Sequence, residues 1–149
     1  TEGDPNFYDF PRPMIHSDNL DMSLSGLKTS VLYKVQKIKN LDHNKKANIA
    51  ASFQKAVTDL LVAKITRAIE EINRKDVIIA GGVAANKFIR SEFKKLEDLF
   101  GIKVYYPDLK YCGDNASMIA FVGSMINAKK RGENTSQVRA RWPLDELKK

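Results

Sequence analysis

The sequence predicts an α/β fold that is rich in helix and has a short parallel sheet. Two short runs rich in β-branched or aromatic residues, 77–80 and 102–106, alternate with longer segments whose apolar residues recur at helical spacing. A helix that connects two successive strands places them parallel, through a right-handed crossover. Only two or three strands can be recognised, against roughly five or six in a typical sheet, so we expect the sheet to be completed from outside this chain.

The first 25 residues contain no sustained helical or alternating pattern. Pro5, Pro11 and Pro13 exclude regular secondary structure over most of this stretch. We therefore predict that residues 1–25 form an extended segment that lies over a surface and links an upstream part of the protein to residues 26–149.

The longest helix is predicted over about residues 48–73, with Asn48 as its N-cap. Its apolar residues recur every three or four positions and form a wide buried stripe. They are Ile49, Phe53, Val57, Leu61, Ile65, Ile69 and Ile72. A shorter helix begins at Gly26, and residues 39–47 are expected to form the polar loop between the two helices.

A strand-to-helix turn follows the first strand. The apolar run stops at Gly81 and Gly82, and a helix over about residues 86–100 begins at Asn86. Such glycines let a backbone approach a phosphate or sugar, or they only relieve close packing of strand and helix. Asn86 offers its amide to a ribose or base, or caps the helix, and the two roles are compatible. Neither a P-loop nor the dinucleotide-binding glycine fingerprint occurs.

A second turn of this kind leads from strand 102–106 into a helix over about residues 115–130, and Asp114 lies at its entrance. A carboxylate in that position caps the helix or ligates a metal ion. His16 and His43 have no partner at metal-ligand spacing. Both turns follow the carboxyl ends of strands, where an open α/β sheet binds its ligand.

Composition narrows the class of protein. The net charge is +7 and the pI about 9.5, which favours a polyanionic partner such as RNA, with plain solubility as the alternative. No apolar run approaches the roughly 18–20 residues needed to span a bilayer, and no signal peptide is recognised. The single cysteine, Cys112, fits a reducing cytoplasm and is expected to be a buried apolar group rather than a nucleophile.

Four segments together resemble the TsaD family, formerly Gcp and once called O-sialoglycoprotein endopeptidase. They are residues 10–14 (FPRPM), 21–29 (DMSLSGLKT), 80–87 (AGGVAANK) and 111–120 (YCGDNASMIA). Residues 141–144 (RWPL) are similar to the bacterial form of the family. The resemblance implies an actin/Hsp70-like (ASKHA, RNase H-like) fold, in which two α/β lobes hold a nucleotide in their cleft. Residues 26–149 match the C-terminal lobe only, so residues 1–25 would be the linker from the N-terminal lobe.

The resemblance implies a transferase of the acyltransferase type. It would move the threonylcarbamoyl group from threonylcarbamoyl-AMP to N6 of adenosine 37 in tRNAs that read ANN codons. Asn86, Gly81 and Gly82 would bind the adenylate. Asp114 would be the last protein ligand of one divalent metal, iron or zinc, whose histidine ligands belong to an H-x-x-x-H run in the first lobe. That run is absent here, so the isolated chain is expected to be inactive.

The implied partners are tRNA, a pseudo-paralogue subunit and a small ATPase in the cytoplasm, with no membrane. One alternative is a non-catalytic nucleotide-binding scaffold lobe of the actin/Hsp70 type. Another is a folded interaction piece that self-associates through its cleft face. The older family label, a metallopeptidase, has little support in the sequence, because neither H-E-x-x-H nor a nucleophile triad occurs.

Overall fold

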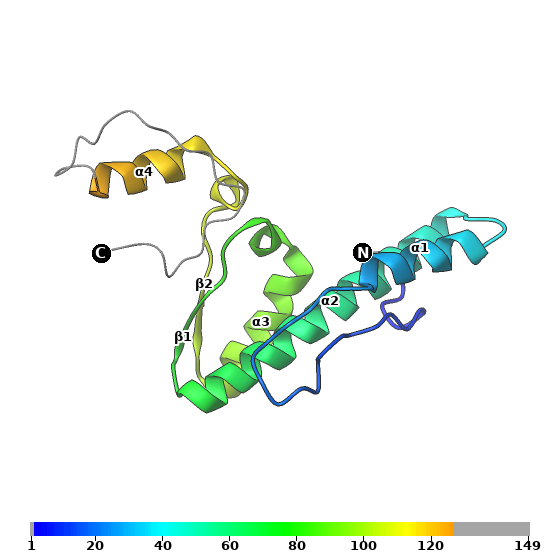
Figure 1. Ribbon diagram of the computed structural model, residues 1–149, viewed down its shortest axis with the longest axis horizontal. Helices are drawn as coiled ribbons and strands as arrows, with labels where there is room; N and C mark the ends of the chain where they lie inside the picture. Colours follow the sequence, from blue (N-terminus) through cyan, green and yellow to red (C-terminus); the bar gives the residue numbers. More distant parts are fainter. Residues whose placement is uncertain (1, 127–149) are drawn as a thin grey trace. The chain divides into compact units, whose positions relative to one another are not determined.

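The computed structural model describes residues 2–126, and the predicted helix end at 127–130 and the RWPL segment lie outside the described residues. The chain divides into two units, residues 1–114 and 115–149. The described elements, drawn in Figure 1, are α1 (Leu27–Lys37), α2 (His43–Ile72), β1 (Asp76–Ile78), the 3₁₀ turn η1 (Gly82–Ala85), α3 (Lys87–Phe100), β2 (Lys103–Tyr105), the 3₁₀ turn η2 (Leu109–Tyr111) and α4 (Ala116–Ile126).

The strands β1 and β2 form a parallel pair joined through α3, so the predicted α/β class and parallel crossover are confirmed for the described residues (Figure 1). Val77 lies opposite Val104 in the register. The ladder continues one step past β1, because the Ile79 amide donates to the Tyr105 carbonyl at 3.0 Å. Both strands are shorter than predicted, and Pro107, which has no N–H to donate, follows the second.

One core cluster lies between α3 and the strand pair. Ile89, Phe93 and Leu96 form the buried side of α3, as the helical spacing predicted. Ile102 and Val104 complete this cluster, and half-buried side chains of α2 pack against it. The cluster therefore holds α2, α3 and β2 together behind the turn that precedes α3.

A second core cluster joins α1, α2 and the N-terminal segment. Phe10 is 1% exposed and packs with Leu27, Ile49 and Ala56. The Tyr8 amide donates to the Ser52 hydroxyl at 3.0 Å. Tyr8 and Phe10 therefore belong to this cluster, although the prolines indicate only an extended surface segment.

The start of α2 differs from the prediction. The helix begins at His43, because the Asp42 carboxylate accepts a hydrogen bond from the Lys45 amide at 2.8 Å and caps it. Asn48 lies inside the helix, and its side-chain oxygen accepts instead from the Asp4 amide at 2.8 Å. The predicted polar loop over residues 39–47 is therefore half helix.

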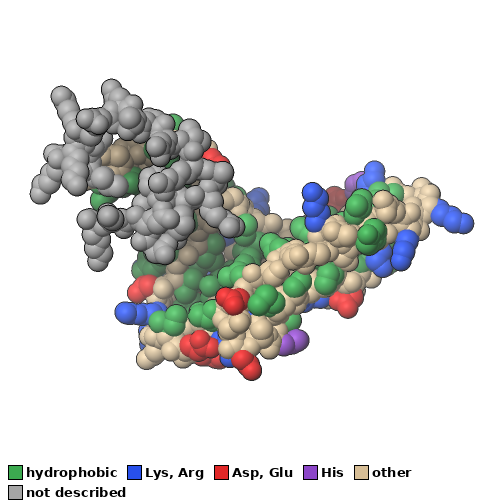
Figure 2. Space-filling view, in the orientation of Figure 1, with side chains coloured by type: hydrophobic (Ala, Val, Ile, Leu, Met, Phe, Trp, Pro, Cys, Tyr) green, Lys and Arg blue, Asp and Glu red, His purple; other side chains and the backbone are tan. Residues whose placement is uncertain are grey.

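A lysine-rich hairpin, residues 27–46, carries most of the net charge. It holds six lysines and one aspartate, whereas the other 129 residues hold 19 basic and 17 acidic side chains. Figure 2 shows basic side chains gathered where α1 leads into α2. The side chains of Lys28, Lys37, Lys39 and Lys46 make no hydrogen bond, ion pair or ring contact within residues 2–126. Over the same residues, no helix combines the length and apolarity needed to cross a membrane.

Candidate functional site

The turn after β1 needs glycine at one position and leaves space at the next. Gly81 has φ 77° and ψ −177°, a conformation that is essentially restricted to glycine. Gly82 opens η1, and a Cβ added to it would meet no atom of the described residues within 4 Å. The same holds for Gly81, so contacts within this part of the chain do not support the alternative that both glycines only relieve close packing.

Asn86 caps α3, as one of the two interpretations of its sequence position predicted. Its side-chain oxygen accepts hydrogen bonds from the amides of Phe88 at 2.9 Å and Ile89 at 3.1 Å. Its amide nitrogen donates to the side-chain oxygen of Gln54, on α2, at 2.9 Å. The side chain is half-buried and held at both ends. The cap and the contact with α2 together fix where this amide lies.

A hollow of about 460 Å³ lies between the turn and α2. Its lining residues are Ala50, Phe53, Gln54, Val57, Gly82, Val83, Asn86 and Ile89. Apolar walls with a few convergent amide groups are typical of small-molecule sites. The hollow also lies beyond the carboxyl end of β1, the position where α/β sheets bind ligands.

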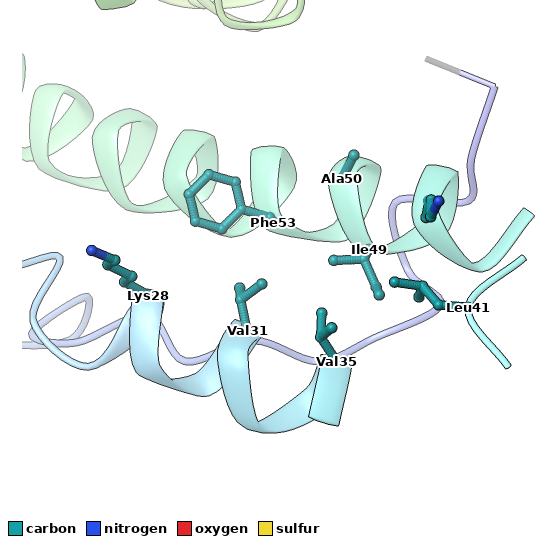
Figure 3. Close-up of a pocket in the computed structure, with 8 residues that line it drawn as sticks. Lys28, Val31, Val35, Leu41, Ile49, Ala50 and Phe53 are labelled. Atoms are coloured by element: carbon teal, nitrogen blue, oxygen red, sulfur yellow. The ribbon is translucent and has the colours of Figure 1, made fainter. Parts of the chain in front are cut away.

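A second hollow, of about 540 Å³, lies between α1 and α2 and shares Ala50 and Phe53 with the first. Figure 3 shows Val31 and Val35 of α1 facing Ile49 of α2 across it. Its walls are apolar apart from two lysines, and it contains neither a glycine turn nor an amide side chain. The hollow beside Asn86 is therefore the better candidate for a nucleotide.

Asp114 is exposed and does not cap the following helix. Asn115 does so, because its side-chain oxygen accepts from the Met118 amide at 3.0 Å. The capping interpretation of Asp114 is therefore wrong, and the reason is that Asn115 occupies the position directly before Ala116, where α4 begins. Within residues 2–126 the Asp114 carboxylate has no hydrogen bond or ion pair.

No group of three metal-ligating side chains occurs in the described part of the chain. Asp114 is thus one free carboxylate donor, suited to ligate a cation but insufficient to hold one by itself. His16 and His43 belong to no such group of three within residues 2–126. Cys112, two residues before Asp114, is 2% exposed, which agrees with its predicted role as a small buried group.

Two residues at this site were not recognised in the sequence. Gln54 lies on a long amphipathic helix, 32 positions before its partner Asn86, and no local pattern marks it. Arg90 lies one turn into α3, with its guanidinium pointing back to the Ala84 carbonyl. Its spacing of four from Asn86 places both on one side of the helix, and this was the only available signal.

The geometry defines an α/β protein with a candidate ligand site at a strand-to-helix turn. The family model for "tRNA N6-adenosine threonylcarbamoyltransferase" matches residues 1–121. The chain therefore belongs to the TsaD family.

Curated relatives agree with this assignment, and each bears the name tRNA N6-adenosine threonylcarbamoyltransferase. The protein of Herminiimonas arsenicoxydans is 44% identical over 98% of this chain and 44% of its own length. The protein of Thermosipho africanus is 47% identical over 85% of this chain and 38% of its own length. The protein of Neisseria meningitidis is 39% identical over 97% of this chain and 46% of its own length. The chain thus spans less than half the length of these relatives.

Proposed function

We propose that this chain is the C-terminal lobe of a tRNA-modifying transferase with the actin/Hsp70-like fold. The complete enzyme transfers the threonylcarbamoyl group from threonylcarbamoyl-AMP to N6 of adenosine 37 in tRNAs that read ANN codons. The family match supports the reaction class. The observation that carries the assignment of the site is the hollow bounded by Gly82, Asn86 and Gln54, directly after β1.

The adenylate binds at the turn between β1 and α3. Gly81 and Gly82 keep side chains away from the backbone there, so a phosphate or sugar oxygen can approach it. The first turn of α3 adds the positive end of its dipole. Phe53 and Val57 supply apolar walls against which an adenine ring packs. Asn86 contributes the amide nitrogen that now contacts Gln54.

Asp114 is the ligand that this chain contributes to one divalent metal, iron or zinc. Its exposed carboxylate, free of other partners in residues 2–126, is the chemical group such a role requires. Residues 2–126 contain no group of three metal-ligating side chains. The remaining ligands therefore come from outside these residues. A metal held there would supply a Lewis acid for the carbonyl of the threonylcarbamoyl group.

The reaction is an acyl-type transfer. The N6 nitrogen of the tRNA adenosine attacks the carbamoyl carbon, and a carbon–nitrogen bond forms. The bond from that carbon to the phosphate oxygen breaks, and AMP leaves with the electron pair while the amine loses a proton. This chain's residues bind and orient AMP. We assign none of them as a general base, and we expect the 149 residues alone to be inactive.

The lysine-rich hairpin is the surface of this lobe that best fits tRNA. Its unpaired lysines provide positive charge to phosphates without first breaking an ion pair within residues 2–126. The further partners are a pseudo-paralogue subunit and a small ATPase, and the complex works in the cytoplasm. The alternative of a non-catalytic nucleotide-binding scaffold is favoured by one observation, the lack of a metal-ligand cluster in residues 2–126.

A transfer assay separates these functions. The complete enzyme that contains this chain is incubated with its partner proteins, threonylcarbamoyl-AMP and unmodified tRNA, and the tRNA nucleosides are measured by mass spectrometry. We expect N6-threonylcarbamoyladenosine with the wild type, and loss of both product and bound metal with Asp114→Ala. Asp108→Ala removes an exposed carboxylate six positions away and serves as the control. Nucleotide binding without transfer supports the scaffold instead.

A further inference from the structure

Arg90 contacts two segments that are far apart in the sequence. Its Nε donates to the carbonyl of Ala84, in η1. Its Nη2 donates to the carbonyl of Pro107 at 3.2 Å and lies 3.7 Å from the sulfur of Cys112. One half-buried guanidinium thus joins the turn before Asn86 to the loop that follows β2.

The two joined segments carry the candidate site residues. Ala84 is fully buried and lies between Gly82 and Asn86. The loop from Pro107 leads through η2 and Cys112 to Asp114, two residues further on. The position of the guanidinium therefore bears on both the adenylate turn and the carboxylate loop within the unit of residues 1–114.

The guanidinium is itself held by a ring. Its central carbon lies 4.6 Å from the centroid of the Tyr106 ring, within the range of a cation–π contact. Burial raises the pKa of Tyr106, so the ring stays neutral at physiological pH. The Tyr106 hydroxyl is buried and has no hydrogen-bond partner among the described residues. The contact of Tyr106 with Arg90 is made by the ring and not by the hydroxyl.

We propose that Arg90 is a positioning residue, whose guanidinium sets the spacing between the Gly81–Asn86 turn and the loop that presents Asp114. A planar guanidinium donates in two directions while its face rests on a ring, whereas a lysine ammonium has neither the fork nor the plane. Arg90 thereby aligns the adenylate with the metal ligand. The adenylate site and the metal-ligand role of Asp114 rest on the proposed function. The link between the two segments rests only on the contacts of Arg90.

Hydrogen exchange tests the link in the full 149-residue chain. Arg90→Lys keeps the charge and removes the fork. We expect the amides of Asn86 and Cys112, each hydrogen-bonded within its own turn, to exchange faster by about tenfold, while the centre of α2 is unchanged. Acceleration in one segment only, or in neither, overturns the proposal. Tyr106→Leu, which removes the ring support, is a second variant expected to accelerate both segments, and Tyr106→Phe is expected to accelerate neither.

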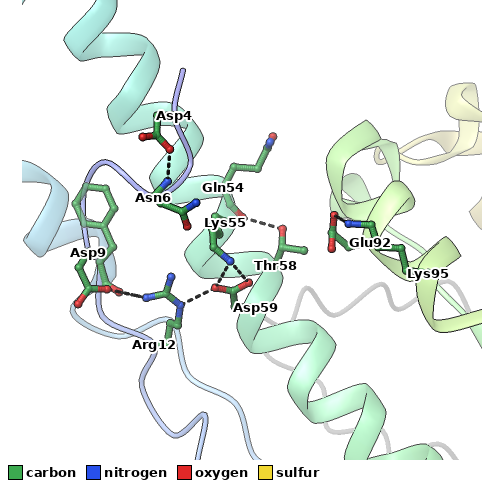
Figure 4. Close-up of polar contacts among 11 residues, drawn as sticks. Asp4, Asn6, Asp9, Arg12, Gln54, Lys55, Thr58, Asp59, Glu92 and Lys95 are labelled. Carbon is green, nitrogen blue, oxygen red and sulfur yellow. Dashed lines mark hydrogen bonds and ion pairs between the residues drawn. The ribbon is translucent and has the colours of Figure 1, made fainter. Parts of the chain in front are cut away.

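Arg12 offers a matched control. It too is a half-buried arginine with several acceptors, because it pairs with Asp9 and Asp59, each at 2.9 Å (Figure 4). Arg12→Lys should lower stability without selectively accelerating exchange at Asn86 or Cys112. If both lysine variants accelerate those two amides equally, Arg90 has no special positioning role.

The complete enzyme gives the functional readout. Arg90→Lys should raise KM for threonylcarbamoyl-AMP and lower bound metal, and Arg12→Lys should change neither at a temperature where both variants are folded. If the wild type transfers nothing to tRNA, the proposed function fails, and the exchange experiment still decides the positioning role. If the wild type is active, and Arg90→Lys and Arg12→Lys have the same KM for threonylcarbamoyl-AMP and the same bound metal, only the positioning role fails.

Discussion

The amide nitrogen of Asn86 donates to the side-chain oxygen of Gln54 across 2.9 Å, and this bond ties the beginning of α3 to α2. The other end of the Asn86 side chain is occupied by the cap of α3. A ligand that uses Asn86 must therefore share or replace the contact with Gln54, because the oxygen is needed to hold the helix. Capping and binding thus use opposite ends of one amide and can be separated by substitution.

Asn86→Ala and Asn86→Ser should separate these two roles. Alanine removes the cap and should lower the free energy of unfolding by about 1 kcal/mol, whereas serine caps through its hydroxyl and should stay within about 0.5 kcal/mol of the wild type. Both lack the amide and should weaken AMP binding by about 1–2 kcal/mol. Denaturant unfolding and calorimetry measure the two effects. Wild-type AMP affinity in Asn86→Ser would exclude the binding role.

Gly81→Ala and Gly82→Ala should differ in the same two measurements. Alanine at Gly81 must adopt φ near 77° and should cost about 1–3 kcal/mol of stability. Alanine at Gly82 meets no described atom within 4 Å and should be close to neutral. We nevertheless expect it to weaken AMP binding about tenfold, or about 1.4 kcal/mol, because its methyl group enters the space of the ligand. Unchanged affinity in Gly82→Ala would show that the ligand does not approach this glycine.

Glu97 should make the packing of α3 on β2 depend on pH. Hydrogen bonds from the Lys94 ammonium at 2.7 Å and the Val104 amide at 2.6 Å lower the pKa of Glu97 below its ordinary value of 4.5. A lowered folded-state pKa gives stability that is present above pH 4.5 and is lost as the pH falls through the folded-state pKa. Glu97→Gln should therefore show a smaller fall in Tm than the wild type on acidification. An equal fall would mean that other carboxylates dominate.

The lysine-rich hairpin should set much of the salt dependence of tRNA binding. A triple change of Lys37, Lys39 and Lys46 to glutamine removes up to three phosphate contacts. The slope of log affinity against log salt concentration should then decrease by about 2–3, since each contact contributes roughly 0.7–0.9. Filter binding of unmodified tRNA to the complete enzyme over a range of salt concentrations measures this slope.

The control for this triple variant removes three basic side chains elsewhere in the chain: Arg74, Lys75 and Lys95. Two of them follow the C-terminal end of α2, and the third lies on α3. The loss of formal charge is identical in the two variants, so a general effect of net charge should change both slopes equally. Equal changes would contradict a specific role for the hairpin.

Helix α3 and its N-terminus could be predicted because several local signals coincide there. Asn86 is a favourable cap, the buried residues follow a helical period, and Gly101 ends the helix in a left-handed conformation. The start of α2 was missed because residues 43–47 contain only one apolar side chain, so the apolar period does not mark this turn. Its cap, Asp42, is a residue that equally favours a loop.

Other features depend on contacts between distant positions. The burial of Phe10 requires α1 and α2 to lie side by side, and no local pattern around three prolines indicates it. Arg90 resembles any charged residue of an amphipathic helix until Tyr106 and Pro107 are placed beside it. Phe10 and Pro107 belong to segments in which proline mainly indicates what cannot form, which is regular helix or strand.

The most direct test of the proposed site is an NMR titration of the 149-residue chain with AMP. We predict that the largest amide shift changes occur over residues 81–86, with a change at the side-chain amide of Gln54, and that they saturate together. Asn86→Ser, which retains its cap, should reduce them. Saturable changes confined to the apolar hollow between α1 and α2, or no saturable change, would contradict the assignment of the turn after β1 as the adenylate site.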